Sequence, residues 1–270
     1  MPRTLPRLPR LPLVMFTRFV FFLACCITAP LEMANAASAA HIVMMIGEDE
    51  YHTWETLPAF AAAELHRSGY RVTIIHADAT EKQSFPGLVA ALRDADLLFV
   101  SVRRRLPPKE QLDAVRAHLI AGKSLIGIRT ACHAFAPLPN IKTIAPGHSI
   151  WQDFDAEVLG AHYTGHHRGT DTTAIALAPR AARNPIVRDI VVEKLIGHAP
   201  LYKVSPLAVD VTPLLIGTFG VMPPEPVAWT RLYGPKHARV FFTSLGAPED
   251  FASTEFRHLL VNAVRWTVDR

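Results

Sequence analysis

The stretch K-S-L-I-G-I-R-T-A-C-H-A-F, residues 123–135, decides the fold that we expect for this chain. Its apolar part, residues 124–128, follows the helix-ending Gly122 and changes abruptly into the polar group at residues 129–133. This pattern is typical of a buried parallel strand whose carboxyl end carries polar side chains. Because open α/β sheets bind ligands outside these strand ends, the polar group marks a candidate site. The other interpretation is a strand followed by an ordinary loop with a half-buried histidine.

Three more apolar runs precede this strand and alternate with helical patterns. The runs lie at residues 42–46, 70–76 and 97–102, and the helical patterns lie at residues 56–65, 88–92 and 107–120. Strands that alternate with helices in this way imply right-handed βαβ crossovers. We therefore predict a three-layer α/β domain with a doubly wound, mainly parallel sheet and a pocket above the carboxyl ends of its strands.

The carboxyl-terminal half is less regular. Proline and glycine interrupt the alternation over residues 136–172. Further strands are expected at residues 172–177, 226–231 and 238–244, with a hairpin turn at Gly234 and an irregular, proline-containing section before it. Ser253 is placed to cap a terminal helix. Because no repeat, linker or second apolar core is evident, residues 41–270 are predicted to form one domain.

Residues 1–36 have the pattern of a secretory signal peptide. Four arginines accompany the apolar run 19–24, and Ala34-Asn35-Ala36 offers a small-x-small cleavage site. An uncleaved anchor is the alternative, but the uncharged run 19–31 contains Pro30 and is shorter than the roughly 20 residues of a membrane span. We expect cleavage near Ala36 and a periplasmic or secreted protein that is not attached to the membrane. Lipidation at Cys25 remains an open alternative.

Charge gives no indication of a nucleic acid partner. The predicted cleavage removes four of the 28 basic and one of the 24 acidic residues, which leaves 24 and 23 and lowers the net charge from +4 to +1. A nearly neutral mature chain lacks the basic surface that binds phosphate backbones. The run Arg103-Arg104-Arg105 is interpreted as a solvated loop.

Cysteine usage raises one catalytic hypothesis. Cys132 is the single cysteine after residue 36, so no internal disulfide is expected. The pair Cys132-His133 suggests a cysteine hydrolase, although neighbours on a loop seldom face each other and a distant histidine would have to act as the base. The sharp turn after the strand, where such enzymes place the nucleophile, is occupied by Arg129. Arginine cannot be the nucleophile, but it can stabilise an anion, an oxyanion or an enolate.

Histidines gather in the irregular section and suggest a metal site. His162, His166 and His167 have a spacing that could bind a divalent ion, with zinc favoured by nitrogen ligands. Gly160 and Gly165 argue against a helix there, so a further ligand from another strand end would be needed. Hydrogen-bonding or general-base roles are the alternative for these histidines.

Six segments together resemble the ThuA-like family, which is named for trehalose utilisation and belongs to the class I glutamine amidotransferase-like superfamily. They are the first strand ending before Tyr51-His52, G-I-R-T-A-C-H-A-F at 127–135, G-A-H-Y-T-G-H-H at 160–167, P-V-A-W-T-R at 226–231, R-V-F-F-T-S-L-G at 239–246 and L-L-V-N-A-V-R-W at 259–266. The resemblance implies a flavodoxin-like core and a place in sugar metabolism, including oxidised disaccharides that carry a keto group. It does not imply glutaminase activity, because the nucleophile position matches Arg129.

Three functions follow as hypotheses. The first is an enzyme that isomerises, eliminates or hydrolyses a sugar or keto-sugar glycoside through an enolate, the second a non-catalytic carbohydrate-binding protein, and the third a cysteine-dependent amide hydrolase. For the first, an imidazole with the ordinary pKa of about 6.5 would be the base. The predicted catalytic residues are Arg129, His133 and His166, and the predicted substrate-binding residues are Glu48, Tyr51, His52, Thr130, Tyr163 and His167. The oligomeric state is left open.

Overall fold

The computed structural model of this chain describes residues 39–138, 140–141, 143–169 and 172–269, together with Met1. The chain divides into two units, Met1–Ala37 and Ser38–Arg270, and the second unit carries the fold. The predicted signal peptide lies outside the described residues. No helix within the described ranges is both long and apolar enough to cross a bilayer.

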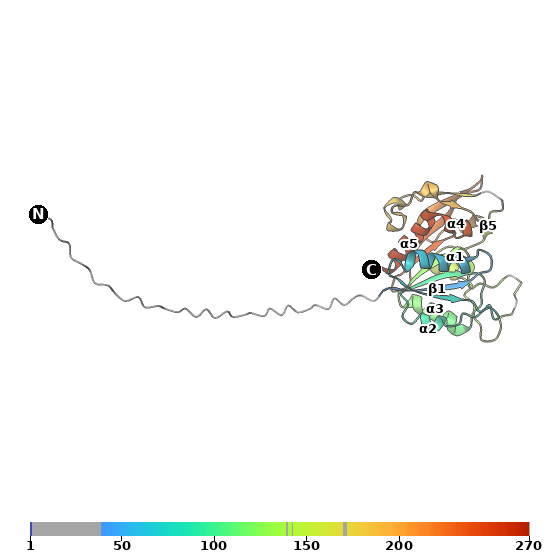
Figure 1. Cartoon of the computed structure of the whole chain (residues 1–270). Coiled ribbons are helices and arrows are strands. Elements are labelled where there is room, and N and C mark those ends of the chain that lie inside the picture. Colours follow the sequence, from blue (N-terminus) through green and yellow to red (C-terminus); the bar gives the residue numbers. More distant parts are fainter. Residues whose placement is uncertain (2–38, 139, 142, 170–171, 270) are drawn as a thin grey trace. The chain divides into compact units, whose positions relative to one another are not determined.

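A nine-stranded sheet forms the centre of the second unit, in the order β2-β1-β3-β4-β11-β10-β9-β6-β7 (Figure 1). The strands are β1 (His41–Gly47), β2 (Arg71–His76), β3 (Leu97–Val102), β4 (Ser124–Ile128), β6 (Thr173–Leu177), β7 (Ile196–Gly197), β9 (Thr212–Phe219), β10 (Glu225–Tyr233) and β11 (Ala238–Thr243). Strands β2, β1, β3, β4 and β11 pair in parallel, and the other pairs are antiparallel. The predicted mainly parallel α/β fold is confirmed for the first half of the sheet.

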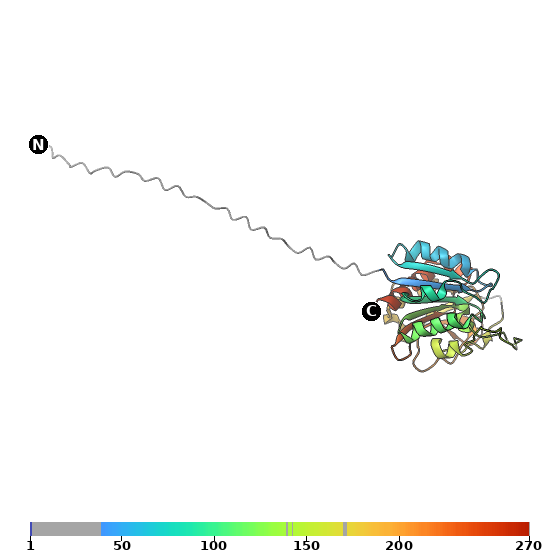
Figure 2. The same ribbon diagram turned by 90° about the horizontal axis from the view of Figure 1, so that it is seen from below.

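Helices cover both faces of the parallel strands. They are α1 (Thr53–Phe60), α2 (Leu88–Ala91), α3 (Lys109–Ile120), α4 (Pro248–Ala252) and α5 (Thr254–Val268). Figures 1 and 2 show α1 and α5 on one face and α2 and α3 on the other. Successive side chains of β1 point to opposite faces of the sheet. Ile42, Met44 and Ile46 pack against the α1–α5 layer, whereas Val43 and Met45 pack against the α2–α3 layer. Such strands need apolar residues at every position, which is the continuous pattern seen in the sequence.

Short helical turns and a small second sheet complete the unit. The turns are Ala61–Leu65, Arg129–His133, Asp155–Leu159, Ala181–Arg183, Pro185–Val187 and Val192–Lys194. The second sheet pairs β5 (Gly165–His166) with β8 (Tyr202–Lys203) in antiparallel fashion. It carries part of the histidine-rich section to the edge of the large sheet at which β4 ends, since His166 and Tyr202 line one cavity together with residues that follow β1, β3 and β4.

Candidate functional site

A small polar cavity of about 90 Å³ lies at the carboxyl ends of β1, β3 and β4. Its walls come from the loops that follow these three strands and from the small β5–β8 sheet. The lining residues are Glu50, Tyr51, Arg103, Arg104, His133, Tyr163, His166 and Tyr202. The structure therefore brings together four of the predicted site residues, Tyr51, His133, Tyr163 and His166, as the strand-end argument anticipates.

Glu48 shapes the loop that carries Tyr51. Its side chain is buried, and Oε2 accepts hydrogen bonds of 2.6 Å from the backbone N–H groups of Glu50 and Tyr51. Oε1 accepts bonds of 2.7 Å from the N–H and the hydroxyl of Thr53. A buried carboxylate group that accepts this many hydrogen bonds fixes the backbone around it. Glu48 is not among the residues that line the cavity.

Arg129 occupies the sharp turn after β4 with a backbone φ of 47°, in the left-handed region. Only 2% of the residue is exposed. Its guanidinium donates to the carbonyl oxygens of Ser244 (2.7 Å) and Pro200 (3.0 Å) and to the hydroxyl of Tyr51 (3.2 Å). Among the described residues it makes no ion pair with a carboxylate, and its Nε has no hydrogen-bond partner. A strained backbone that carries a buried cation is typical of functional sites.

Two tyrosine rings hold the Arg129 guanidinium. Its Cζ lies 4.0 Å from the ring centroid of Tyr202 and 4.6 Å from that of Tyr51. Burial acts to lower the pKa of Arg129, but the oxygens of Tyr202 and Tyr51 outweigh it and raise the pKa above its usual value. The charge is therefore permanent. Tyr51 and Tyr202 line the cavity and Arg129 does not, so the Arg129 guanidinium lies behind the tyrosines that form the cavity wall.

His133 is buried and electrically neutral. Burial lowers its pKa to about 3, and the charges of Arg104, Arg103 and Arg129 act in the same direction. Its ring lies 4.7 Å from that of Tyr163. The expectation of a base with a pKa of about 6.5 is wrong for His133, because a group this difficult to protonate accepts a proton poorly near neutrality.

Cys132 faces His133, contrary to expectation for neighbours on a loop. The distance from its Sγ to Nδ1 of His133 is 3.2 Å. Burial raises the pKa of the Cys132 thiol well above its usual value, while the pKa of His133 is lowered. Both shifts favour the neutral pair over a thiolate and an imidazolium, so the pair lacks the activated nucleophile of a cysteine hydrolase.

His166 is the more exposed of the two cavity histidines. Its Nδ1 lies 3.2 Å from the hydroxyl oxygen of Tyr163. Partial burial, followed by the charges of Arg129 and Arg168, lowers the pKa of His166. Burial raises the pKa of Tyr163 to about 12, so this hydroxyl keeps its proton near neutrality. A neutral imidazole bonded to a protonated phenol can take up and release a proton, which gives the cavity one group suited to general-base chemistry.

The three histidines that were predicted to bind zinc have separate surroundings. His162 is mostly exposed, and its Nδ1 lies 3.2 Å from Oδ2 of Asp155. His167 is buried, with its ring stacked 6.5 Å from that of Phe219 and its Nε2 without a partner. Across the described ranges no three His, Cys, Asp or Glu side chains gather closely enough to hold a metal. The residues at these positions do not fit the predicted ion.

Like Glu48 and His167, the predicted substrate-binding residues His52 and Thr130 do not line the cavity. His52 is exposed, with its ring centroid 4.6 Å from that of Trp54, and Thr130 is fully buried with a hydroxyl that has no partner. In contrast, Arg104 lines the cavity although its run was interpreted as a solvated loop. Arg104 follows β3, which lies between β1 and β4 in the sheet. Its place at the carboxyl end of a parallel strand was therefore a signal in the sequence that could have identified it. Tyr202 lies in a proline-containing section that carried no such signal.

The parallel sheet and the site at the ends of its strands define an α/β protein of the flavodoxin-like class. A family model described as ThuA, trehalose utilisation, matches residues 43–267. This chain therefore belongs to the ThuA family. No curated protein sequence matches it.

Solved structures support the same fold. A ThuA-like protein of Bacteroides uniformis ATCC 8492 aligns with a TM-score of 0.65 and 16% identity over 90% of this chain and 96% of its own. A ThuA-like protein of Parabacteroides merdae ATCC 43184 aligns with a TM-score of 0.60 and 13% identity over 86% and 90%. The β-galactosidase of Rahnella sp. R3 aligns with a TM-score of 0.54 and 13% identity over 86% of this chain but 32% of its own. At these identities the likeness concerns the fold alone.

Proposed function

We propose that this ThuA-family chain is an enzyme of carbohydrate metabolism that acts on a sugar or keto-sugar glycoside by moving a proton next to a carbonyl group. The observation that carries the proposal is the bond from Arg129 to the hydroxyl of Tyr51. Because this hydroxyl oxygen accepts a hydrogen bond from a permanent cation, its own proton is available to another acceptor. Tyr51 lines the cavity, so a ligand oxygen there can be that acceptor.

The chemistry has two parts. A base removes the proton from the carbon beside the carbonyl, and the electron pair of the broken C–H bond moves onto the carbonyl oxygen to give an enolate. The oxygen then bears a negative charge that a fixed donor stabilises more strongly than the neutral ground state. The Tyr51 hydroxyl supplies this donor, and Arg129 positions and polarises the hydroxyl by donating a hydrogen bond to its oxygen.

His166 is better suited than His133 to be the base. It is more exposed, and its pKa is lowered without the deep burial that brings His133 to about 3. In an isomerisation, His166 returns the proton to the former carbonyl carbon, while the proton of the adjacent hydroxyl group moves to the former carbonyl oxygen. In an elimination, the enolate re-forms the carbonyl and a new C=C bond as the C–O bond to the leaving group breaks, and the leaving oxygen takes the proton. Tyr163 holds the ring through the contact to Nδ1.

The size of the cavity limits what it encloses. At about 90 Å³ it is far smaller than the roughly 300–1,000 Å³ of sites that surround a whole drug-sized ligand. It suits the reacting keto group and its adjacent carbon, while the remainder of a glycoside extends outward. We extend the proposal to location: residues 1–36 direct export, so the substrate is met in the periplasm or outside the cell.

Paired variants test the proposal on the turnover of a keto-disaccharide. Tyr51→Phe should lower kcat by about a hundredfold, which is typical when one oxyanion donor is lost, with a small effect on KM. His166→Asn should lower kcat as well. Tyr70→Phe, which removes a hydroxyl from the loop before β2, is the matched control and should behave like the parent protein.

The alternatives make different statements about the same variants. A carbohydrate-binding protein without chemistry would bind the keto-disaccharide and leave it unchanged. A cysteine hydrolase would lose its activity in Cys132→Ser and keep it in Tyr51→Phe. Either result would remove the support for the enolate mechanism.

A further inference from the structure

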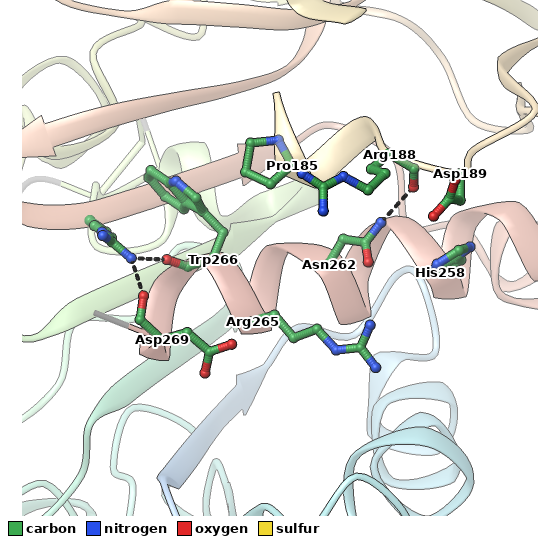
Figure 3. Close-up of a pocket in the computed structure, with 9 residues that line it drawn as sticks. Pro185, Arg188, Asp189, His258, Asn262, Arg265, Trp266 and Asp269 are labelled. Atoms are coloured by element: carbon green, nitrogen blue, oxygen red, sulfur yellow. Dashed lines mark hydrogen bonds between the residues drawn. The ribbon is translucent and has the colours of Figure 1, made fainter. Parts of the chain in front are cut away.

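A larger pocket, of about 500 Å³, shares no lining residue with the strand-end cavity. Figure 3 shows this pocket. One wall is the exposed side of α5, another is the segment 185–189, and Arg239 contributes from the beginning of β11. Because β11 runs parallel to β4, its beginning lies at the edge of the sheet opposite the strand carboxyl ends. This pocket is therefore separate from the site proposed above, and its volume is in the range of sites that enclose small molecules.

Hydrogen bonds fix the walls of this pocket. The buried side chain of Asn262 donates from Nδ2 to the carbonyl oxygens of Ile186 (3.2 Å) and Arg188 (2.9 Å), so the segment is tied to α5. Arg239 donates from Nη1 to the carbonyl oxygens of Trp266 (2.5 Å) and Asp269 (2.6 Å) at the end of the helix. A pocket with walls held in this way needs little ordering when a ligand binds, which favours affinity.

The charged groups of the pocket are not paired with one another. Arg188, Arg239 and Arg265 all line it, and none lies within ion-pair distance of a carboxylate in the part of the chain that the structure describes. Asp189 and Asp269 line it as well, so the arginines outnumber the carboxylates by one. Arg239 is bonded to carbonyl oxygens at the end of α5, whereas Arg188 is exposed and free to adapt to a ligand.

Trp266 adds a flat surface to this polar set. Its half-buried indole lines the pocket together with Pro185, and Cζ of Arg239 lies 5.5 Å from the ring centroid. An indole face packs against a ring, carboxylates and amides bond to hydroxyl groups, and arginine forks bind carboxylate or phosphate oxygens. Each kind of group that an acidic sugar presents thus has a counterpart in the pocket.

We propose that this pocket is a second ligand site, for a monosaccharide that carries an acidic group. The acid lies against Arg188 and Arg265, the ring covers Trp266, and the hydroxyl groups bond to Asp189 and Asn262. A carboxylate and a phosphate share the chemistry that the arginines recognise. The site stands independently of the enolate mechanism, because it uses none of the residues of the strand-end cavity.

The test is a titration followed by the indole N–H signals of the protein in NMR. The probes are D-glucuronate and D-glucose 6-phosphate, with neutral D-glucose and inorganic phosphate as controls. At least one acidic sugar should bind saturably, at least about tenfold more tightly than both controls, and should shift the indole signal of Trp266. The signal of Trp229, which is fully buried, should not move. The tighter of the two acidic sugars identifies the acid that the site prefers.

Variants assign the binding to this pocket. Arg188→Gln should weaken it about tenfold or more, as expected for the loss of a charged hydrogen bond. The exposed Arg183→Gln is the matched control and should bind as the parent protein does. Tyr51→Phe should also leave this binding unchanged, which separates the second site from the proposed function.

Four results would overturn the second site. They are no saturation by either acidic sugar up to about 10 mM, equal binding of inorganic phosphate, unchanged binding in Arg188→Gln, and loss of binding in Tyr51→Phe. The last would place the ligand in the strand-end cavity.

Discussion

Two buried histidines should make this protein lose stability on mild acidification. Burial lowers the pKa of His133 to about 3 and that of His118 to about 4. In the unfolded chain both would titrate near 6.5. Below pH 6.5 the unfolded state therefore binds protons that the folded state does not, and the free energy of unfolding must fall as the pH falls from 6.5 toward 4.

The magnitude follows from the distance between the pH and the unfolded pKa. Each pH unit below 6.5 costs about 1.36 kcal/mol per histidine until the folded pKa is reached. At pH 5.0 the loss is about 2 kcal/mol for each histidine and about 4 kcal/mol for both. A typical domain has only 5–15 kcal/mol of stability, so the effect should be easily measured. Burial acts to raise the pKa of Asp49, but Arg105 and Lys82 outweigh it and lower that pKa. Protonation of Asp49 therefore reduces the free energy of unfolding further, but only at lower pH.

Urea unfolding of the mature protein at pH 7.5 and pH 5.0 is the assay. His118→Gln and His133→Gln remove one titrating group each, so each variant should lose about 2 kcal/mol less than the parent between the two pH values. His66→Gln, at an exposed position, is the matched control. If the parent and both buried-site variants lose the same free energy, the histidines are not held neutral by burial and the reasoning is refuted.

Three further predictions concern the loop, the export signal and the metal. Glu48→Gln should lower the free energy of unfolding by about 1.5–3 kcal/mol and should also lower turnover, because a charged acceptor that fixes the Tyr51 loop is lost. Urea unfolding and kinetics measure the two effects, and an unchanged kcat would contradict the role of the loop. Mass spectrometry of the exported protein should find an amino terminus near residue 37, whereas a retained Met1 would indicate an anchor. Dialysis against a chelator should change neither the urea midpoint nor turnover, and a loss that zinc restores would show that a metal site was overlooked.

The parallel half of the fold could be predicted because each strand is buried on both faces. Continuous apolar runs such as residues 42–46 and 97–102 have few other interpretations when helical patterns separate them. The antiparallel half was predicted less completely. β9 was missed because Thr212–Phe219 contains Pro213 and Gly217, which weaken a strand pattern, and tertiary pairing with β10 and β6 overrides that weakness.

The sequence predicted where the candidate site lies, but it did not predict the pKa values of the residues in that site. The ends of adjacent parallel strands meet by geometry, so Tyr51 and His133 could be placed together from the sequence. The low pKa of His133 could not be predicted, since it depends on burial and on arginines from the ends of other strands. The direction of the Arg129 side chain, toward Tyr51 and the carbonyl of Ser244, depends in the same way on tertiary packing.

Deuterium exchange measures the proposed proton transfer itself. The protein is incubated in D2O with a keto-disaccharide, and NMR follows the C–H signals beside the carbonyl group. The account predicts that the parent protein accelerates the loss of one such signal, that Tyr70→Phe does so equally, and that Tyr51→Phe is slower by about a hundredfold. Bound keto-disaccharide with no accelerated exchange, or equal exchange in Tyr51→Phe and the parent protein, would contradict it.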